Sequence, residues 1–157
     1  MKKIIAIAVV AALSMTNVAH AAKKKVTPLF DMTQEKIENV DKTYQCYAAE
    51  ETTVNDGIES KARDAILYND AELHLKSNED GTITAILRSD YQAHKTIMTF
   101  YKKRKFSDSD DHYFQYWSDL HNRFDGSVNG FVSLAAAKDF IQWTRQQHDE
   151  KIRVWCK

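Results

Sequence analysis

The sequence contains only two cysteines, Cys46 and Cys156, and their positions constrain the fold more than any other feature of the chain. In a chain exported to an oxidising compartment, two distant cysteines are typical of a single disulfide. A bond between them closes a loop of about 110 residues, which the chain-entropy treatment values at about 4–5 kcal/mol of stability. We therefore expect a disulfide that holds the segment around Cys46 beside the C-terminal segment.

The first 21 residues have the composition of a secretory signal peptide. Two lysines follow the initial methionine, residues 4–15 form a nearly continuous apolar run, and residues 19–21 place small side chains where a signal peptidase reads them. We expect cleavage after Ala21, which leaves residues 22–157 as a single globular domain in the periplasm or outside the cell. The apolar run is shorter than the roughly 20 residues that span a bilayer, so we expect no membrane anchor after cleavage.

The mature chain is expected to be close to neutral. The full sequence has 22 basic and 22 acidic residues, and removal of Lys2 and Lys3 with the signal peptide leaves 20 basic residues against 22 acidic ones. Such a balance gives no overall attraction to nucleic acid or to an anionic membrane. We therefore expect no nucleic-acid partner.

Residues 71–87 carry the clearest strand pattern in the sequence. Leu73 and Leu75 alternate with charged and polar neighbours, as in a strand with one buried face, and residues 78–81 have the composition of a compact turn. This pattern predicts a β-hairpin. Three further strands are expected, near residues 43–50, 95–103 and 151–156.

Two segments, residues 111–124 and 134–148, have the apolar periodicity of amphipathic helices. In the first, the apolar side chains fall within an arc of about 120° on a helical projection. The residues in this arc are Tyr113, Phe114, Trp117, Leu120, His121 and Phe124. Gly126 is placed to end this helix, and Ser133 is placed to cap the second one.

Together these elements predict an α+β fold. A small antiparallel sheet would carry the two amphipathic helices on one face, and one disulfide would tie the first strand to the C-terminus. Residues 90–105 and 149–156 fit either a strand or a helix. The alternative is a mainly α fold in which residues 90–105 and 134–156 are helical.

No catalytic or metal-binding motif is present in the sequence. The chain lacks G-x-S-x-G, S-x-x-K, H-E-x-x-H and a glycine-rich phosphate loop. We therefore expect no catalytic residue, no metal site and no cofactor. The alternative is a site that the fold assembles from distant acids and histidines, such as His74, His94 and His148.

One strong charge run is a candidate contact for an anionic partner. It consists of Lys102, Lys103, Arg104 and Lys105, with an aromatic residue on either side. An acidic run at residues 108–111 follows immediately and partly neutralises its field. The alternative is a solvated strand end without a ligand.

The missing catalytic motifs favour a non-catalytic protein that binds another protein of the cell envelope, as an inhibitor or immunity factor for an envelope-acting protein does. Two alternatives remain. One is an envelope hydrolase with a site built from distant residues. The other is a structural or chaperone-like envelope component that uses exposed aromatic residues such as Tyr113, Tyr116 and Trp143. The sequence leaves the oligomeric state open.

The surroundings of the two cysteines resemble one known family. Tyr44-x-Cys46 and Trp155-Cys156 resemble the corresponding ends of exported c-type lysozyme inhibitors, which are small and tied by a disulfide. Those inhibitors block the lysozyme cleft with a loop rich in serine and glycine, and this sequence has no such run. The resemblance covers the two cysteines and their neighbours only, so it does not assign the chain to that family.

Overall fold

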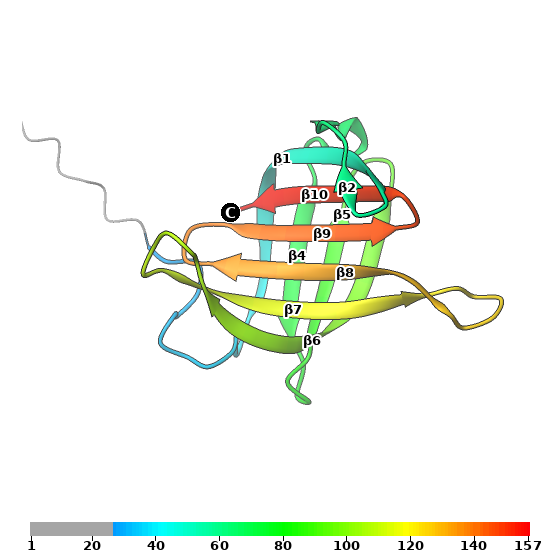
Figure 1. The fold of residues 1–157 in the computed structure, drawn as a ribbon. Helices are drawn as coiled ribbons and strands as arrows, with labels where there is room; N and C mark the ends of the chain where they lie inside the picture. Colours follow the sequence, from blue (N-terminus) through cyan, green and yellow to red (C-terminus); the bar gives the residue numbers. More distant parts are fainter. Residues whose placement is uncertain (1–26) are drawn as a thin grey trace, which may run out of the picture.

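Apolar and polar side chains alternate along most of the chain, and the strands that they form close into an antiparallel barrel of eight strands (Figure 1). The computed structural model describes residues 27–157. The barrel strands are β1 (Asp41–Asn55), β4 (Glu72–Ser77), β5 (Ile83–Arg88), β6 (Ala93–Lys105), β7 (His112–His121), β8 (Val128–Ala137), β9 (Ile141–Gln147) and β10 (Glu150–Cys156). Two short strands, β2 (Ile58–Glu59) and β3 (Arg63–Asp64), and a 3-10 turn, η1 (Ile66–Tyr68), lie between β1 and β4.

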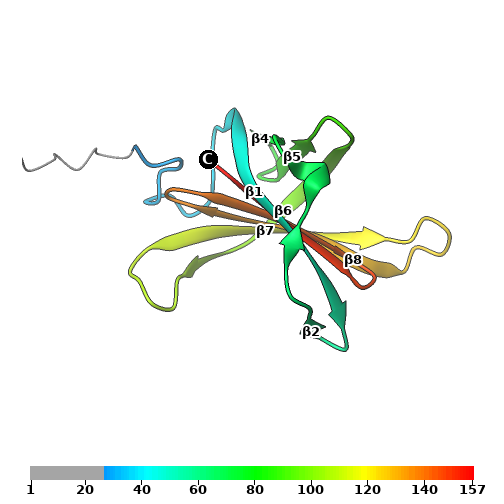
Figure 2. The same cartoon turned by 90° about the horizontal axis from the view of Figure 1, so that it is seen from above.

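The two longest strands, β1 and β6, bend and belong to both layers of the barrel. In Figure 1, β7–β10 run across the front while β4 and β5 cross behind them, and Figure 2 shows β4 and β5 on one side of the front layer. Residues 41–45 of β1 pair with β4, and residues 46–53 pair with β10. The register shifts between Cys46 and Ala48 in β1 and between Phe100 and Lys102 in β6. Such bulges bend strands where a barrel turns a corner.

Inward-facing side chains fill the barrel. An interior enclosed by eight strands is narrow enough for side chains to fill it. The largest side chains with less than 2% exposure include Trp143, Tyr44, Tyr116, Phe114, Leu73, Leu75, Ile83, Leu87 and Met98. The interior is therefore a packed core, and the surfaces that can bind a partner lie on the outside.

The segment before β1 closes one end of the barrel. Ile37 is buried there, and its backbone N–H donates a hydrogen bond of 3.1 Å to the hydroxyl of Tyr116. Burial raises the pKa of Tyr116 to about 12, so this hydroxyl stays protonated. Lys103 Nζ donates to the carbonyl oxygens of Met32 and Gln34, at 2.6 and 3.0 Å. These contacts fix the segment over the core.

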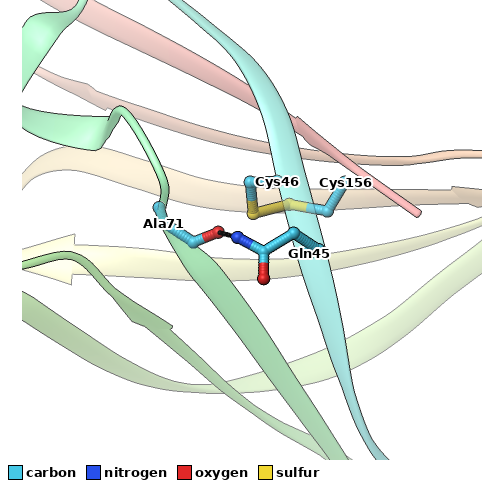
Figure 3. Close-up of a disulfide and its surroundings, with 4 residues drawn as sticks. All are labelled: Gln45, Cys46, Ala71 and Cys156. Carbon is cyan, nitrogen blue, oxygen red and sulfur yellow. Dashed lines mark hydrogen bonds between the residues drawn. A yellow bond between two sulfur atoms is a disulfide. The ribbon is translucent and has the colours of Figure 1, made fainter.

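The expected disulfide is confirmed, and it lies where β1 passes from one neighbour to the other (Figure 3). Cys46 and Cys156 are register partners in the β1–β10 ladder, and both are buried. The Gln45 side chain donates to the carbonyl oxygen of Ala71 at 3.2 Å. The Gln45 backbone also exchanges hydrogen bonds with Lys157. The disulfide therefore joins β1 to β10 covalently at the point where the barrel closes.

The predicted α+β fold is wrong, and so is the mainly α alternative. The predicted helix at residues 111–124 is strand β7. In β7, Phe114 and Tyr116 point into the core, while Tyr113 and Trp117 lie half-buried on the outer face. Aromatic residues on both faces hide the two-residue period and fall by coincidence on a helical arc. The high strand propensity of aromatic residues outweighs that periodicity.

The predicted helix at residues 134–148 contains the end of β8, a turn and all of β9. The turn at residues 138–140 contains neither glycine nor proline, so the sequence gives no sign of the break. The segments that fitted either structure, residues 90–105 and 149–156, form β6 and β10. The predicted hairpin at residues 71–87 is confirmed as β4 and β5, which pair in register from Glu72 with Arg88 to Ser77 with Ile83.

The expected signal peptide and its cleavage site after Ala21 lie outside the described residues. Within residues 27–157, none of the helical structure has the length and apolar character that a membrane crossing requires.

Candidate binding surface

The structure divides the basic run on β6 between different contacts. Lys103 holds the segment before β1, as described above, and Lys105 forms a 2.7 Å ion pair with Asp110. Lys102 and Arg104 both lie over the ring of Tyr101, at 5.1 and 5.8 Å from its centroid. Only Lys102 and Arg104 are thus placed to meet an anionic partner, and that contact stays a prediction.

The histidines that could have formed a distant site lie in separate surroundings. His74 contacts Thr43 and Asp41, His94 contacts Tyr68, and His148 lies in the turn between β9 and β10. In the part of the chain that the structure describes, no group of three or more His, Cys, Asp or Glu side chains could hold a metal ion. The described residues therefore assemble no such site from these histidines.

Two of the three aromatic residues expected at the surface are buried. Tyr116 and Trp143 are fully buried in the barrel core, and only Tyr113 reaches the outer face. The exposed aromatic side chains are instead Tyr47, Tyr91, Tyr101 and Phe124.

The loop between β7 and β8, residues 122–127, extends beyond the body of the barrel (Figures 1 and 2). Phe124 lies in this loop and is 87% exposed, the largest exposed fraction among the large apolar side chains of residues 27–157. The guanidinium of Arg123 lies 5.3 Å from the centre of its ring. The loop therefore presents one uncovered aromatic side chain away from the rest of the molecule.

Hydrogen bonds within the loop fix its backbone. Asn122 N–H donates to the Ser127 carbonyl at 2.7 Å, and Gly126 N–H donates to the Asn122 carbonyl at 2.8 Å. The Asn122 side chain accepts from the Phe124 N–H at 2.9 Å. The Asp125 carboxylate accepts from the N–H and the hydroxyl of Ser127, and these bonds lower the pKa of Asp125. Gly126 adopts a φ of 72°, which favours glycine.

A hollow of about 430 Å³ lies on the outer face of β7, β8 and β9, near the end of β7 opposite to the loop. Strand register explains its depth. Three outward-facing residues, Gln115, Ala135 and Gln142, lie side by side across the three strands. In the neighbouring row of outward-facing residues, Ser133 pairs with Thr144. The small side chains of β8 lie between longer ones on β7 and β9, so the surface is lowest along β8. We refer to this site as the outer hollow.

Aromatic side chains form one wall of the outer hollow. The Phe106 ring lies 4.7 Å from Tyr113 and 6.1 Å from Phe140, measured between ring centroids. On the same face but outside the hollow, Trp117 stacks on Phe131 at 4.2 Å and donates to Asp119. This face therefore combines aromatic rings with amides and hydroxyls.

Charged side chains on the adjoining outer face neutralise one another. Arg153 on β10 bonds to Glu50 at 2.9 Å and to Glu59 at 2.5 Å, and Lys151 bonds to Glu59 as well. Hydrogen bonds from Arg153 and Lys151 lower the pKa of Glu59. These contacts join β2 to the barrel and pair both cations with carboxylates.

Comparison with models of known protein families finds no match for this chain, and comparison with curated proteins finds none either.

Sequence reasoning missed both the loop and the outer hollow. The helical periodicity puts Phe124 on a helical face and makes Gly126 the end of that helix. The polar Asn122-Arg123 and Asp125-Gly126-Ser127 segments between two apolar runs are typical of a hairpin connection, and this signal could have located the loop. Nothing in the sequence could have located the hollow, because it depends on the register of three strands.

A half-buried histidine predicts loss of stability at low pH. His94 bonds to the Tyr68 hydroxyl at 3.0 Å and packs 5.8 Å from Trp143. Burial, and secondarily the charge of Arg145, lower the pKa of His94 from 6.5. Because the unfolded chain takes up this proton first, the free energy of unfolding falls as the pH drops from 6.5 through the folded-state pKa.

Urea denaturation at a series of pH values from about 7 to 5 measures this effect. We expect His94→Gln to flatten this part of the profile, because the glutamine does not titrate. His112→Gln, which changes an exposed histidine on β7, is the control for the loss of an imidazole as such. An identical slope for His94→Gln and the wild type would contradict the assignment.

Proposed function

We propose that the protein is a non-catalytic binding protein of the periplasm or the extracellular space. It binds another protein of the cell envelope through the β7–β8 loop, as an inhibitor or immunity factor for an envelope-acting protein does. The observation that carries the proposal is Phe124, 87% exposed on a loop whose backbone is held by its own hydrogen bonds.

The rigidity of this loop favours a folded partner. A phenyl ring that leaves water for an apolar pocket gains about 25 cal/mol per Å² of buried surface. A few aromatic anchors of this kind supply most of the binding energy in many interfaces. Because the loop is already ordered, binding costs little conformational entropy. A single projecting anchor fits a pocket or cleft, whereas a surface for unfolded clients needs a broad apolar patch.

Truncation of the anchor tests the proposal. We expect Phe124→Ala to raise the Kd for the partner at least about 30-fold, close to 2 kcal/mol. The stability of the protein should not change, because the ring contacts little of its own chain. Ile66→Ala is the matched control, since Ile66 is an apolar side chain 70% exposed on η1.

The partner is first captured from cell-envelope extract with the oxidised mature protein, and its Kd is then measured by calorimetry for the wild type and both variants. A lysozyme is a defined partner to assay first, by inhibition of cell-wall lysis. Equal affinities of Phe124→Ala and the wild type would refute the role of the loop. Release of sugars or muropeptides by the pure protein would indicate the hydrolase, and suppressed aggregation of unrelated unfolded proteins would indicate the chaperone-like component.

A further inference from the structure

We propose that the outer hollow binds a neutral sugar ring. The inference concerns a second surface and does not depend on the β7–β8 loop. The volume of about 430 Å³ lies within the range of small-molecule sites. The polar floor of the hollow, its aromatic wall and its charge each restrict the kind of ligand that fits.

The floor offers groups that both donate and accept hydrogen bonds. Gln115 and Gln142 lie on either side of Ala135, and Ser133 and Thr144 supply hydroxyls in the next row. An amide or a hydroxyl can both donate a hydrogen bond to a ligand hydroxyl and accept one from it. A carboxylate can only accept, and an ammonium group can only donate. A ligand that carries several hydroxyls around a ring satisfies such a floor most fully.

The amide oxygen of Gln115 lacks a hydrogen-bond donor in the part of the chain that the structure describes. This atom, Oε1, is buried and has no hydrogen-bond partner among residues 27–157. A buried carbonyl oxygen without a partner costs about 1–3 kcal/mol. A ligand hydroxyl that draws this amide into the hollow gives the oxygen a donor, and part of that cost is recovered on binding.

The aromatic wall suits the C–H face of a sugar. Phe106, Tyr113 and Phe140 place rings beside the polar floor. The face of an aromatic ring carries partial negative charge and attracts the partially positive C–H hydrogens of an apolar ring face. A pyranose combines such a C–H face with hydroxyls at its edge, which matches a wall and a floor of these two kinds.

The described residues that line the hollow provide no unpaired charge for an anionic ligand. Among the described residues, Lys105 is the only charged one that lines it, and this side chain is paired with Asp110 at 2.7 Å. The described lining therefore offers no unpaired cation to a nucleotide or a phosphorylated sugar. Lys102 and Arg104, the register partners of Gln115 and Tyr113, lie beside the hollow on β6 and are not part of its lining. The ligand expected from these contacts is therefore an uncharged sugar, either free or as one unit of a glycan.

Nuclear magnetic resonance titration of the oxidised mature protein tests the inference. The probes are glucose, N-acetylglucosamine and soluble neutral oligosaccharides of each, at millimolar concentration. We expect the side-chain NH₂ signals of Gln115 and Gln142 to shift. A tighter Kd for an oligosaccharide than for its monomer identifies a glycan as the ligand, and equal values identify a free sugar.

Two glutamines on one strand provide matched variants. Gln142→Ala removes a floor amide and should raise the Kd about tenfold. Gln146→Ala changes the same residue type on the same face of β9 outside the lining, and should leave the Kd within about twofold. Ala135→Leu fills the floor and should abolish binding, while unfolding curves report whether each variant is folded. No shift with any probe, or equal Kd values for both glutamine variants, would overturn the proposal.

Discussion

Replacement of Cys46 and Cys156 together by alanine is expected to lower the free energy of unfolding by about 4–5 kcal/mol. The bond spans 110 residues, so its loss gives the unfolded chain a large gain in entropy. Both positions are buried where β1 leaves β4 and joins β10. Because domains of this size are stable by about 5–15 kcal/mol, this loss removes between about a third and nearly all of the stability.

Urea denaturation of the oxidised wild type, the reduced wild type and the double variant separates the bond from the residues. The reduced wild type keeps both sulfur atoms and should lose nearly as much stability as the variant. If reduction costs little while the double variant costs several kcal/mol, packing of the cysteines accounts for the effect instead. A loss below about 1 kcal/mol in both would contradict the entropic argument.

Gly130→Ala is expected to destabilise the protein by about 3 kcal/mol, at the upper end of overpacking effects. A Cβ atom at this position would lie 2.2 Å from the carbonyl oxygen of Gln146 and 3.0 Å from Cα of Gln147. Both atoms belong to the backbone of β9, which pairs with β8 at this point. Neither can move aside unless the two strands separate locally.

Gly126→Ala is the matched control for this substitution. A Cβ atom at Gly126 meets nothing within 4 Å, so only its φ of 72° opposes alanine. We expect that variant to lose about 1–2 kcal/mol. Thermal unfolding compares the two, and hydrogen exchange should show increased opening of the β8–β9 ladder in Gly130→Ala alone. Equal losses in both variants would show that the contact with β9 is relaxed at little cost.

The strands that could be predicted from the sequence are those with one polar face. Leu73 and Leu75 alternate with charged residues, so β4 and its return strand are evident from the residue pattern alone. In β7, Trp117 and Tyr113 occupy the outer face, and the alternation disappears. At the turn into β9, Lys138 and Asp139 replace the glycine or proline that would mark a break. Tertiary pairing overrides local periodicity at both places.

The candidate sites were less predictable, for a related reason. The disulfide could be predicted from the number of cysteines and the expected compartment, but the loop that presents Phe124 requires knowledge that residues 112–137 form a hairpin. Gln115 and Gln142 are 27 positions apart in the sequence, and only the registers of β7 with β8 and of β8 with β9 bring them to either side of one alanine. The basic run, by contrast, is evident in the sequence. Side chains alternate between the two faces of β6, so the structure gives the members of this run different contacts.

The two proposed surfaces lie at opposite ends of the β7–β8 ladder. Tyr113, in the wall of the outer hollow, is near the start of β7, and the loop with Phe124 follows its end. One surface can therefore be occupied without covering the other. A protein partner and a sugar should bind independently, and the Kd for one should not depend on saturation with the other.

Closure of the barrel has a consequence for oxidative folding. The hairpins from β4 to β10 join neighbouring segments, whereas the β1–β10 ladder joins segments about 100 residues apart and should form last. Cys46 and Cys156 meet only in that ladder, so native oxidation follows closure and locks a barrel that has already folded. With two cysteines in the chain, no incorrect pairing within one molecule is possible. An oxidant is therefore sufficient to form the native disulfide, and a disulfide isomerase has no intramolecular error to correct.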